Sequence, residues 1–304
     1  MKKYKWGILS ISILCVVSVI VWLVVVPSKK DVEATIYQLT MTDEDGGAGY
    51  GIVLPSGKLI MIDGGYTSDS MEVAKFIEKQ GGIVSAWFIT HPHFDHVGGL
   101  LPIMEGSVGD FVIETVYYSE FTEEYFTTEA EGKDLEILNT AVLLEEFHAL
   151  FTVEDTVFTP VNRDDVIELE GITITCMNGF DELVYDVNAN SLVLHFDFGV
   201  TTFLATGDIT DLSIMNMIAH YGEDHKLWDV DYVQIPHHGY MAGISNDQLY
   251  RLTTPAYAFL DCSLQEFVND AVNIQMHLEM LHALQIPIIM RFEGDNEIRI
   301  GEIL

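Results

Sequence analysis

The sequence HPHFDH places three histidines and one aspartate within six positions: His91, His93, Asp95 and His96. An apolar run precedes this cluster, and Gly98 and Gly99 follow it, where they would let the next backbone segment pack closely. A buried imidazole is costly unless a partner uses its lone pair, and histidine with carboxylate is a ligand set that suits zinc and similar divalent ions. The spacing therefore predicts a metal site, with the first two histidines on one ion and Asp95 and His96 turned toward another.

Two later apolar runs also end in potential ligands. The first ends in Thr206, Gly207 and Asp208, and the second ends in His237 and His238 before a glycine. In layered α/β folds, ligand sites gather at the carboxyl ends of strands, because a strand holds an exposed loop rigidly there. The ends of three predicted strands therefore carry potential ligands.

The elements that must position these residues follow from the hydrophobic pattern. Apolar runs alternate with helical spacing, which predicts strands sandwiched by helices. The predicted strands are 34–40, 50–55, 58–65, 83–90, a hairpin over 166–177, a pair over 189–209, 231–240, 286–292 and 297–304. The predicted helices are 68–82, 133–151 and one long helix over 263–284. No tract marks a linker, so residues 31–304 are predicted to form one domain.

The N-terminus is a separate segment. Residues 6–26 carry no charge over a length that spans a bilayer, and Lys2, Lys3 and Lys5 precede them. The run is longer than the apolar part of a cleaved signal and lacks its small-residue exit. We expect residues 1–28 to be an uncleaved single-pass membrane anchor, with everything after Pro27 outside the cytoplasm.

Charge limits the partners. The chain of 304 residues is 49% hydrophobic, enough for a substantial core, and it has 14 Lys and Arg against 47 Asp and Glu, a formal net charge of −33. Five of the cations flank the apolar run, which leaves nine for the body. This potential repels phosphate polymers and argues against duplex nucleic acid as a partner. Cys176 and Cys262, the two cysteines of the body, are either one disulfide or two buried thiols.

The motifs resemble those of the metallo-β-lactamase-fold hydrolases, whose HxHxDH signature HPHFDH matches without gaps. MIDGG at 61–65 resembles the family's early aspartate motif, ATGD at 205–208 its bridging aspartate and IPHHG at 235–239 its last histidine. The resemblance implies an α/β fold, a four-layer αββα sandwich, after the transmembrane helix.

It also implies two divalent ions, zinc first, with manganese or iron as alternatives. The implied ligands are His91, His93, Asp95, His96, Asp208, His238 and His237. His91 and His93 belong to one ion. Asp95, His96 and either His238 or His237, preferably His238, belong to the other ion. Asp208 bridges both ions. Asp63 would orient a ligand histidine without touching metal, so Asp63, Asp95 and Asp208 are the implied catalytic carboxylates.

Within the family, residues 190–239 are most similar to the extracellular domain of ComEC/Rec2-type competence proteins and its stand-alone relatives. One departure is that many members supply a further histidine before the bridging aspartate, where this chain has Asn188 and Asn190. The available alternatives are His148, on a predicted helix, and His195, in mid-strand.

The resemblance implies hydrolysis by a hydroxide bridging two metals. We expect a small or surface-tethered phosphodiester as substrate. The alternatives are a single-stranded DNA nuclease related to DNA uptake, a β-lactam or thioester hydrolase, and a non-catalytic surface binding module.

Overall fold

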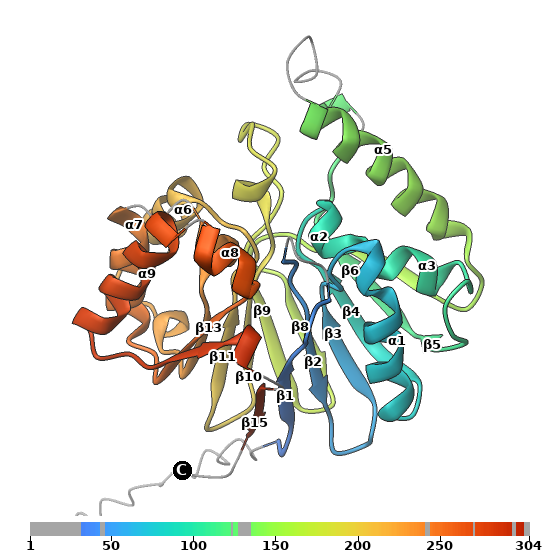
Figure 1. Ribbon diagram of the computed structural model, residues 1–304, viewed down its shortest axis with the longest axis horizontal. Coiled ribbons are helices and arrows are strands. Elements are labelled where there is room, and N and C mark those ends of the chain that lie inside the picture. The colour runs from blue at the N-terminus through green and yellow to red at the C-terminus, as the bar shows by residue number, and fades with distance from the viewer. Residues whose placement is uncertain are drawn as a thin grey trace, which may run out of the picture.

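The chain folds into two facing β-sheets with helices on both outer faces. The computed structural model describes residues 32–42, 46–122, 124–126, 135–240, 244–269, 271–293 and 296–300. In Figure 1 the sheets stand side by side, with one group of helices outside each, so the layers run helix, sheet, sheet, helix. The predicted mixed α/β class with layered strands is confirmed.

The first sheet is built mainly from the N-terminal half, and its order is β15-β1-β2-β3-β4-β6-β7, with β5 on β4. β1, β2 and β3 pair antiparallel, whereas β3, β4, β6 and β7 run parallel. Its strands are β1 (Thr35–Gln38), β2 (Tyr50–Val53), β3 (Leu59–Ile62), β4 (Ile83–Ile89), β5 (Val112–Ile113), β6 (Thr115–Tyr118), β7 (Val157–Pro160) and β15 (Asn296–Arg299).

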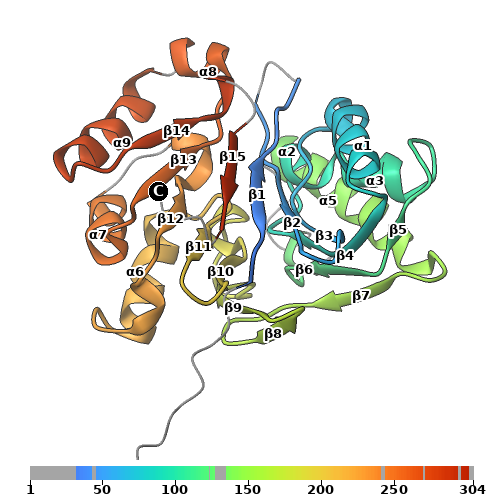
Figure 2. The same cartoon turned by 90° about the horizontal axis from the view of Figure 1, so that it is seen from below.

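The second sheet is built from the C-terminal half, in the order β14-β13-β12-β11-β10-β9-β8. β8 to β11 pair antiparallel, and β11 to β14 run parallel. Its strands are β8 (Val166–Leu169), β9 (Ile172–Asn178), β10 (Val193–Asp197), β11 (Thr202–Ala205), β12 (Tyr232–Gln234), β13 (Tyr257–Leu260) and β14 (Ile288–Met290). Figure 2 shows β15, the last strand, crossing back to lie beside β1 of the first sheet.

Two groups of helices cover the outer faces (Figure 1). The first sheet is covered by α1 (Ser70–Lys79), α2 (Phe94–Val97), α3 (Leu100–Met104) and α5 (Leu135–Ala149). The second is covered by α6 (Asp211–Tyr221), α7 (Ile244–Thr253), α8 (Leu264–Asn269) and α9 (Ala271–Ala283). The single long helix predicted over 263–284 is therefore two helices, since α8 ends at Asn269, a residue type with weak helix propensity.

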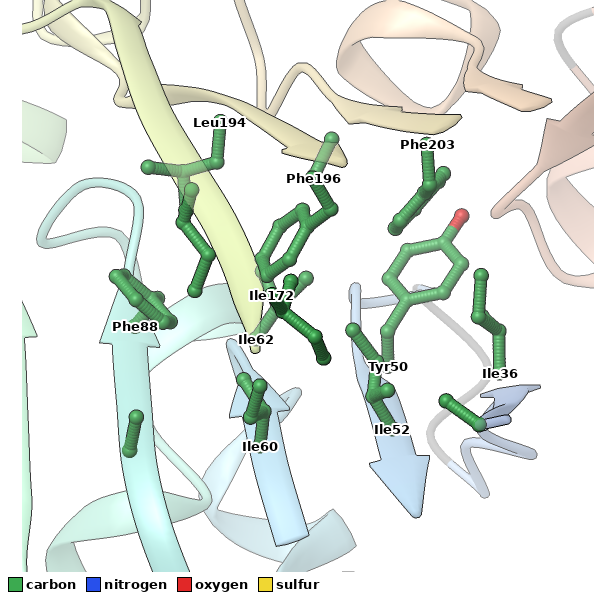
Figure 3. Close-up of a cluster of buried hydrophobic side chains, with 14 of the residues drawn as sticks. Ile36, Tyr50, Ile52, Ile60, Ile62, Phe88, Ile172, Leu194, Phe196 and Phe203 are labelled. Carbon is green, nitrogen blue, oxygen red and sulfur yellow. The ribbon is translucent and has the colours of Figure 1, made fainter. Parts of the chain in front are cut away.

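The space between the sheets is filled by apolar side chains from both. Figure 3 shows Ile60, Ile62 and Phe88 of the first sheet facing Leu194 and Phe196 of the second. All five are at most 1% exposed. Burying this much apolar surface fixes one sheet against the other, so loops at one end of both sheets hold a defined relative position.

The predicted membrane anchor, residues 1–28, lies outside the described residues. Among the residues that the structure describes, no helix has the length and apolar character needed to cross a membrane.

Candidate metal centre

The predicted ligands lie on loops that follow strands of both sheets. Asp63 directly follows β3, and the HPHFDH cluster follows β4 after Thr90. Asp208 follows β11, and the adjacent His237 and His238 follow β12. In each sheet, parallel strands deliver these residues to the carboxyl ends of strands, as the sequence pattern predicts, and both sets lie at one end of the sandwich.

Four of these residues form a tight cluster. One ligand atom each from Asp95, His96, Asp208 and His238 lies within 4.8 Å of the others. Nε2 of His96 is 3.3 Å from Nε2 of His238, 3.2 Å from Oδ1 of Asp208 and 3.6 Å from Oδ2 of Asp95. Nε2 of His238 is 3.1 Å from Oδ2 of Asp95 and 3.4 Å from Oδ2 of Asp208.

These spacings fit a divalent cation. Zinc bonds to nitrogen and oxygen are about 2.0–2.2 Å, so neighbouring ligands of a tetrahedral ion lie about 3.3 Å apart. The distances in the cluster scatter around that length. Oδ1 of the buried Asp208 has no neighbouring donor in the described structure other than Nε2 of His96, so a cation between these two atoms would satisfy the carboxylate.

The charges of the cluster also fit a cation. Burial alone would lower the pKa of His96 and His238, but nearby carboxylates, Asp208 foremost, raise both well above the usual histidine value. Burial would raise the pKa of Asp95 and of Asp208, but the two histidines outweigh it and hold both low. The same carboxylates that hold protons on the imidazoles would stabilise a metal ion in place of those protons.

Asp63 orients His96. Its Oδ2 lies 2.8 Å from Nδ1 of His96, and its carboxylate also accepts the backbone N–H and the hydroxyl of Thr90, at 2.8 Å each. Asp63 has a φ of 52°, a left-handed conformation that costs energy for a residue with a Cβ. The carboxylate therefore fixes the ring so that Nε2 faces the cluster.

The glycines after the motif allow the two loops to touch. A Cβ on Gly99 would collide with the carbonyl oxygen of Gly64, and one on Gly98 with that of Phe94. The N–H of Gly64 donates to the His96 carbonyl at 2.7 Å. The predicted close packing after the histidine cluster is confirmed.

A buried network holds the ligands of the second sheet. Nδ1 of His238 lies 3.1 Å from the backbone carbonyl of Asp261. The Gln234 side chain accepts the N–H groups of Thr206 and Gly207, at 2.8 and 2.9 Å, and donates to the Asp261 carboxylate at 2.9 Å. One amide thus ties the turn before Asp208 to the strand end that orients His238.

The Asp261 carboxylate is itself fully buried and well supplied with donors. Gln38 and Tyr50 each donate to it at 2.6 Å. Burial raises the pKa of Asp261, and these two donors act in the opposite direction. Sequence reasoning overlooked Gln234, Tyr50 and Asp261; the available signal was a polar residue at the end of an apolar strand, which does not by itself say what it contacts.

The other predicted ligands flank the tight cluster. Nε2 of His91 lies 3.0 Å from Nδ1 of His93 and 3.8 Å from Oδ2 of Asp208, and Nε2 of His237 lies 3.8 Å from the same oxygen. Burial, with neighbouring His96 and His93, lowers the pKa of His91 well below its usual value, which leaves a neutral ring able to bind metal. The Ser191 hydroxyl, also absent from the predicted site, lies 3.2 Å from Nδ1 of His91 and accepts the N–H of Asp208.

The two histidines considered in place of the missing one lie elsewhere. His148, on α5, makes tilted and edge contacts with the rings of Phe147 and Phe151, and His195 is a buried residue in mid-β10 whose pKa is lowered by burial. Cys176 and Cys262 are both buried free thiols, which answers the question that the sequence left open.

Comparison with known proteins identifies the family. The sequence model of the metallo-beta-lactamase superfamily matches residues 45–211, more than half of the chain. No curated protein matches the sequence closely enough to count as a relative.

Solved structures share the fold at low sequence identity. The metallo-beta-lactamase fold protein YhfI from Bacillus subtilis is 11% identical, with a TM-score of 0.52 over 84% of this chain and 96% of its own. Unliganded yeast PDE1 is 12% identical, with a TM-score of 0.50 over 85% of this chain and 97% of its own. A variant of the CmlA beta-hydroxylase is 13% identical, with a TM-score of 0.50 over 90% of this chain and 54% of its own. Proteins with different names thus share this fold, so the reaction must be argued from the site.

Proposed function

This chain belongs to the metallo-beta-lactamase superfamily, and from that membership we propose that it is a two-metal hydrolase of a small or surface-tethered phosphodiester. The observation that carries the proposal is the buried cluster of Asp95, His96, Asp208 and His238. Divalent ions held by such residues lower the pKa of bound water and neutralise charge that develops on a phosphoryl or acyl oxygen.

The protein's own residues prepare the site for this chemistry. Asp95 and Asp208 supply fixed negative charge, and Asp63 holds His96 through Nδ1 so that Nε2 stays available. The Asp261 carbonyl does the same for His238. Because these groups are positioned before any substrate arrives, little reorganisation is needed during the reaction.

Charge supports a small substrate over a long polyanion. Four cations of the described part form ion pairs with neighbouring carboxylates: Lys58 with Glu114, Lys75 with Glu72, Arg251 with Asp247 and Arg299 with Glu297. A further cation, Arg291, is buried. A groove that tracks single-stranded DNA needs free cations along the backbone path, and of the described cations only Lys79, Arg163 and Lys226 lie outside these ion pairs and are not buried.

A single-stranded DNA nuclease is the second candidate, because residues 190–239 resemble the competence-type domain. A β-lactam or thioester hydrolase would use the same pair of ions, and a surface binding module would keep the fold without catalysis. Each of these functions predicts a different result in one substrate panel.

The test uses the full-length chain, purified in mild detergent and loaded with zinc or manganese. We expect turnover of chromogenic phosphodiesters or phosphocholine esters, lost in Asp208→Asn and retained in His220→Ala, whose exposed imidazole pairs with Asp164. Cleavage of single-stranded DNA without turnover of small diesters would show that the protein is a nuclease. Turnover of a lactam or thioester alone would show that it is a hydrolase of that substrate instead. A folded protein that binds no metal at micromolar zinc or manganese would refute the hydrolase.

The proposal includes the location. An anchor over residues 1–28 would hold the domain at the outer surface of the cell membrane, within reach of a surface-tethered substrate. Protease added to intact cells should then digest the body. Protection of the body, or a mature protein that lacks the first segment, would contradict this topology.

A further inference from the structure

The Asp208 carboxylate is surrounded by more imidazoles than the tight cluster uses. Its Oδ2 lies 3.4 Å from Nε2 of His238 and 3.8 Å from Nε2 of both His91 and His237. His91 in turn contacts His93, 3.0 Å away. Two histidines outside the four-residue cluster, His91 and His237, therefore lie beside Asp208, and His93 contacts the first of them. The sequence leads us to expect His91 and His93 on that side, but not His237.

His237 reaches Asp208 through an unusual backbone conformation. His237 has φ 52° and ψ 48°, and His238 has φ 53° and ψ 15°. In an extended segment, adjacent side chains would point to opposite faces, but the left-handed turn lets both imidazoles approach Oδ2 of Asp208. Each such residue costs about 1–2 kcal/mol relative to right-handed backbone, and conformations of this kind persist where the site requires them. The N–H of His237 also donates to the carbonyl of Gly207, at 3.1 Å, which holds this turn against the one that carries Asp208.

Asn188 lies beside the nitrogen of His237 that faces Asp208, and one of its own polar atoms is unused. Its Nδ2 is 3.4 Å from Nε2 of His237, while its Oδ1 and Nδ1 of His237 are buried without hydrogen-bond partners in the described structure. Such orphaned polar atoms are rare in folded proteins, and two neighbouring side chains that each carry one indicate that a ligand normally lies beside them. An amide oxygen is a good ligand for harder divalent ions, and an imidazole suits zinc, iron or nickel.

We propose that the turn at 237–238 divides its two histidines between two ions: His238 joins Asp95 and His96 on one, and His237, with the Asn188 amide beside it, joins His91 and His93 on the other. Asp208 serves both. The inference rests on the proposed function, because it presupposes a centre of two ions, and it gives His237 a role separate from that of its neighbour.

The test counts metal ions rather than turnover. The full-length chain in detergent is loaded with cobalt(II), freed of excess metal and analysed for bound ions per chain by mass spectrometry, with the cobalt absorption spectrum as a second readout. His237→Asn is the main variant, because asparagine tolerates left-handed backbone and the turn should survive. His237→Ala and Asn188→Ala accompany it, and His220→Ala is the matched control.

We expect two ions in the wild type and in His220→Ala, and one in His237→Asn, with the affinity for the retained ion unchanged. Asn188→Ala should keep both sites, with the affinity for the ion at His91, His93 and His237 lowered about 10- to 100-fold. Two ions with unchanged affinities in both His237 variants would overturn the inference and leave the hydrolase intact. One ion in the wild type would overturn it as well, whereas no ion in the wild type would refute the proposed function too.

Discussion

Replacing Gln234 by glutamate should show how much the hydrogen bond from Gln234 to Asp261 contributes to the stability of the buried network. Gln234 is 1% exposed, and the substitution preserves its size. One oxygen of Gln234→Glu still accepts the N–H groups of Thr206 and Gly207. The other replaces the Nε2 donor that lies 2.9 Å from the Asp261 carboxylate, so two carboxylates then face each other.

Two alternative costs determine how much Gln234→Glu lowers the free energy of unfolding. Two unit charges 2.9 Å apart repel by about 6 kcal/mol at an effective dielectric constant of about 20. Protonating one carboxyl at pH 7 costs about 3–4 kcal/mol, given an ordinary glutamate pKa of about 4.3. Protonation costs less than the repulsion, so one of the two carboxyl groups takes up a proton. We therefore expect Gln234→Glu to lower the free energy of unfolding by about 3–4 kcal/mol at pH 7 and by about 1 kcal/mol at pH 5. The sign follows because the pKa in the folded state is raised, so the penalty grows as the pH rises.

Thermal and urea unfolding of the full-length chain in detergent, followed by circular dichroism, would measure this. Gln248→Glu is the matched control, because Gln248 also donates to a carboxylate, that of Glu223, but at the exposed surface. It should cost less than about 1 kcal/mol. Combining Gln234→Glu with Asp261→Asn restores a donor between the two side chains, so the double variant should be more stable than the sum of the single losses by about 2–3 kcal/mol. Additive losses, or a cost that does not change with pH, would refute this reasoning.

Three further predictions concern the metal, acid stability and the thiols. Asp208→Asn should remove both ions and lower the melting temperature of the metal-loaded protein, whereas retention of two ions by mass spectrometry would contradict the bridging role. Burial lowers the pKa of His277 to about 4, so the stability that depends on its neutral form should be lost as the pH falls from 6.5 toward that value. The loss in the free energy of unfolding over this pH range is about 3 kcal/mol. The melting temperature of His277→Gln, measured as a function of pH, should lack this contribution. Burial raises the pKa of Cys176 and of Cys262 to about 12, so iodoacetamide at pH 8 should label them only after unfolding, as peptide mapping would show.

Local patterns predict the site better than its supports. His91 and His93 follow a strongly apolar strand, and Asp208 follows another, so their positions at strand ends could be predicted from residue type and spacing. The approach of His96 to His238 depends on how two sheets pack, and only the family resemblance implied it. The left-handed turn at 237–238 could not be predicted from residue type, because histidine adopts this conformation more often than most residues but is still mostly found with negative φ.

The buried partners were harder to foresee for another reason. Tyr50 and Asp261 lie 211 residues apart and meet across the two sheets. A polar residue in an apolar strand signals that a partner exists, but its identity depends on the tertiary fold. The single helix predicted over 263–284 is a similar case, since its spacing is that of one helix whereas the structure has two, α8 and α9.

The division of the ligands between the two sheets has a consequence for how the protein matures. His96 and His238 are 142 residues apart, so the complete ligand set exists only after both halves of the chain have formed and docked. Contacts of such long range form late in folding, and an incomplete chain offers only the isolated histidines of its first half. Tight metal capture thus marks the end of folding. Ion retention would separate finished molecules from intermediates that already have their secondary structure.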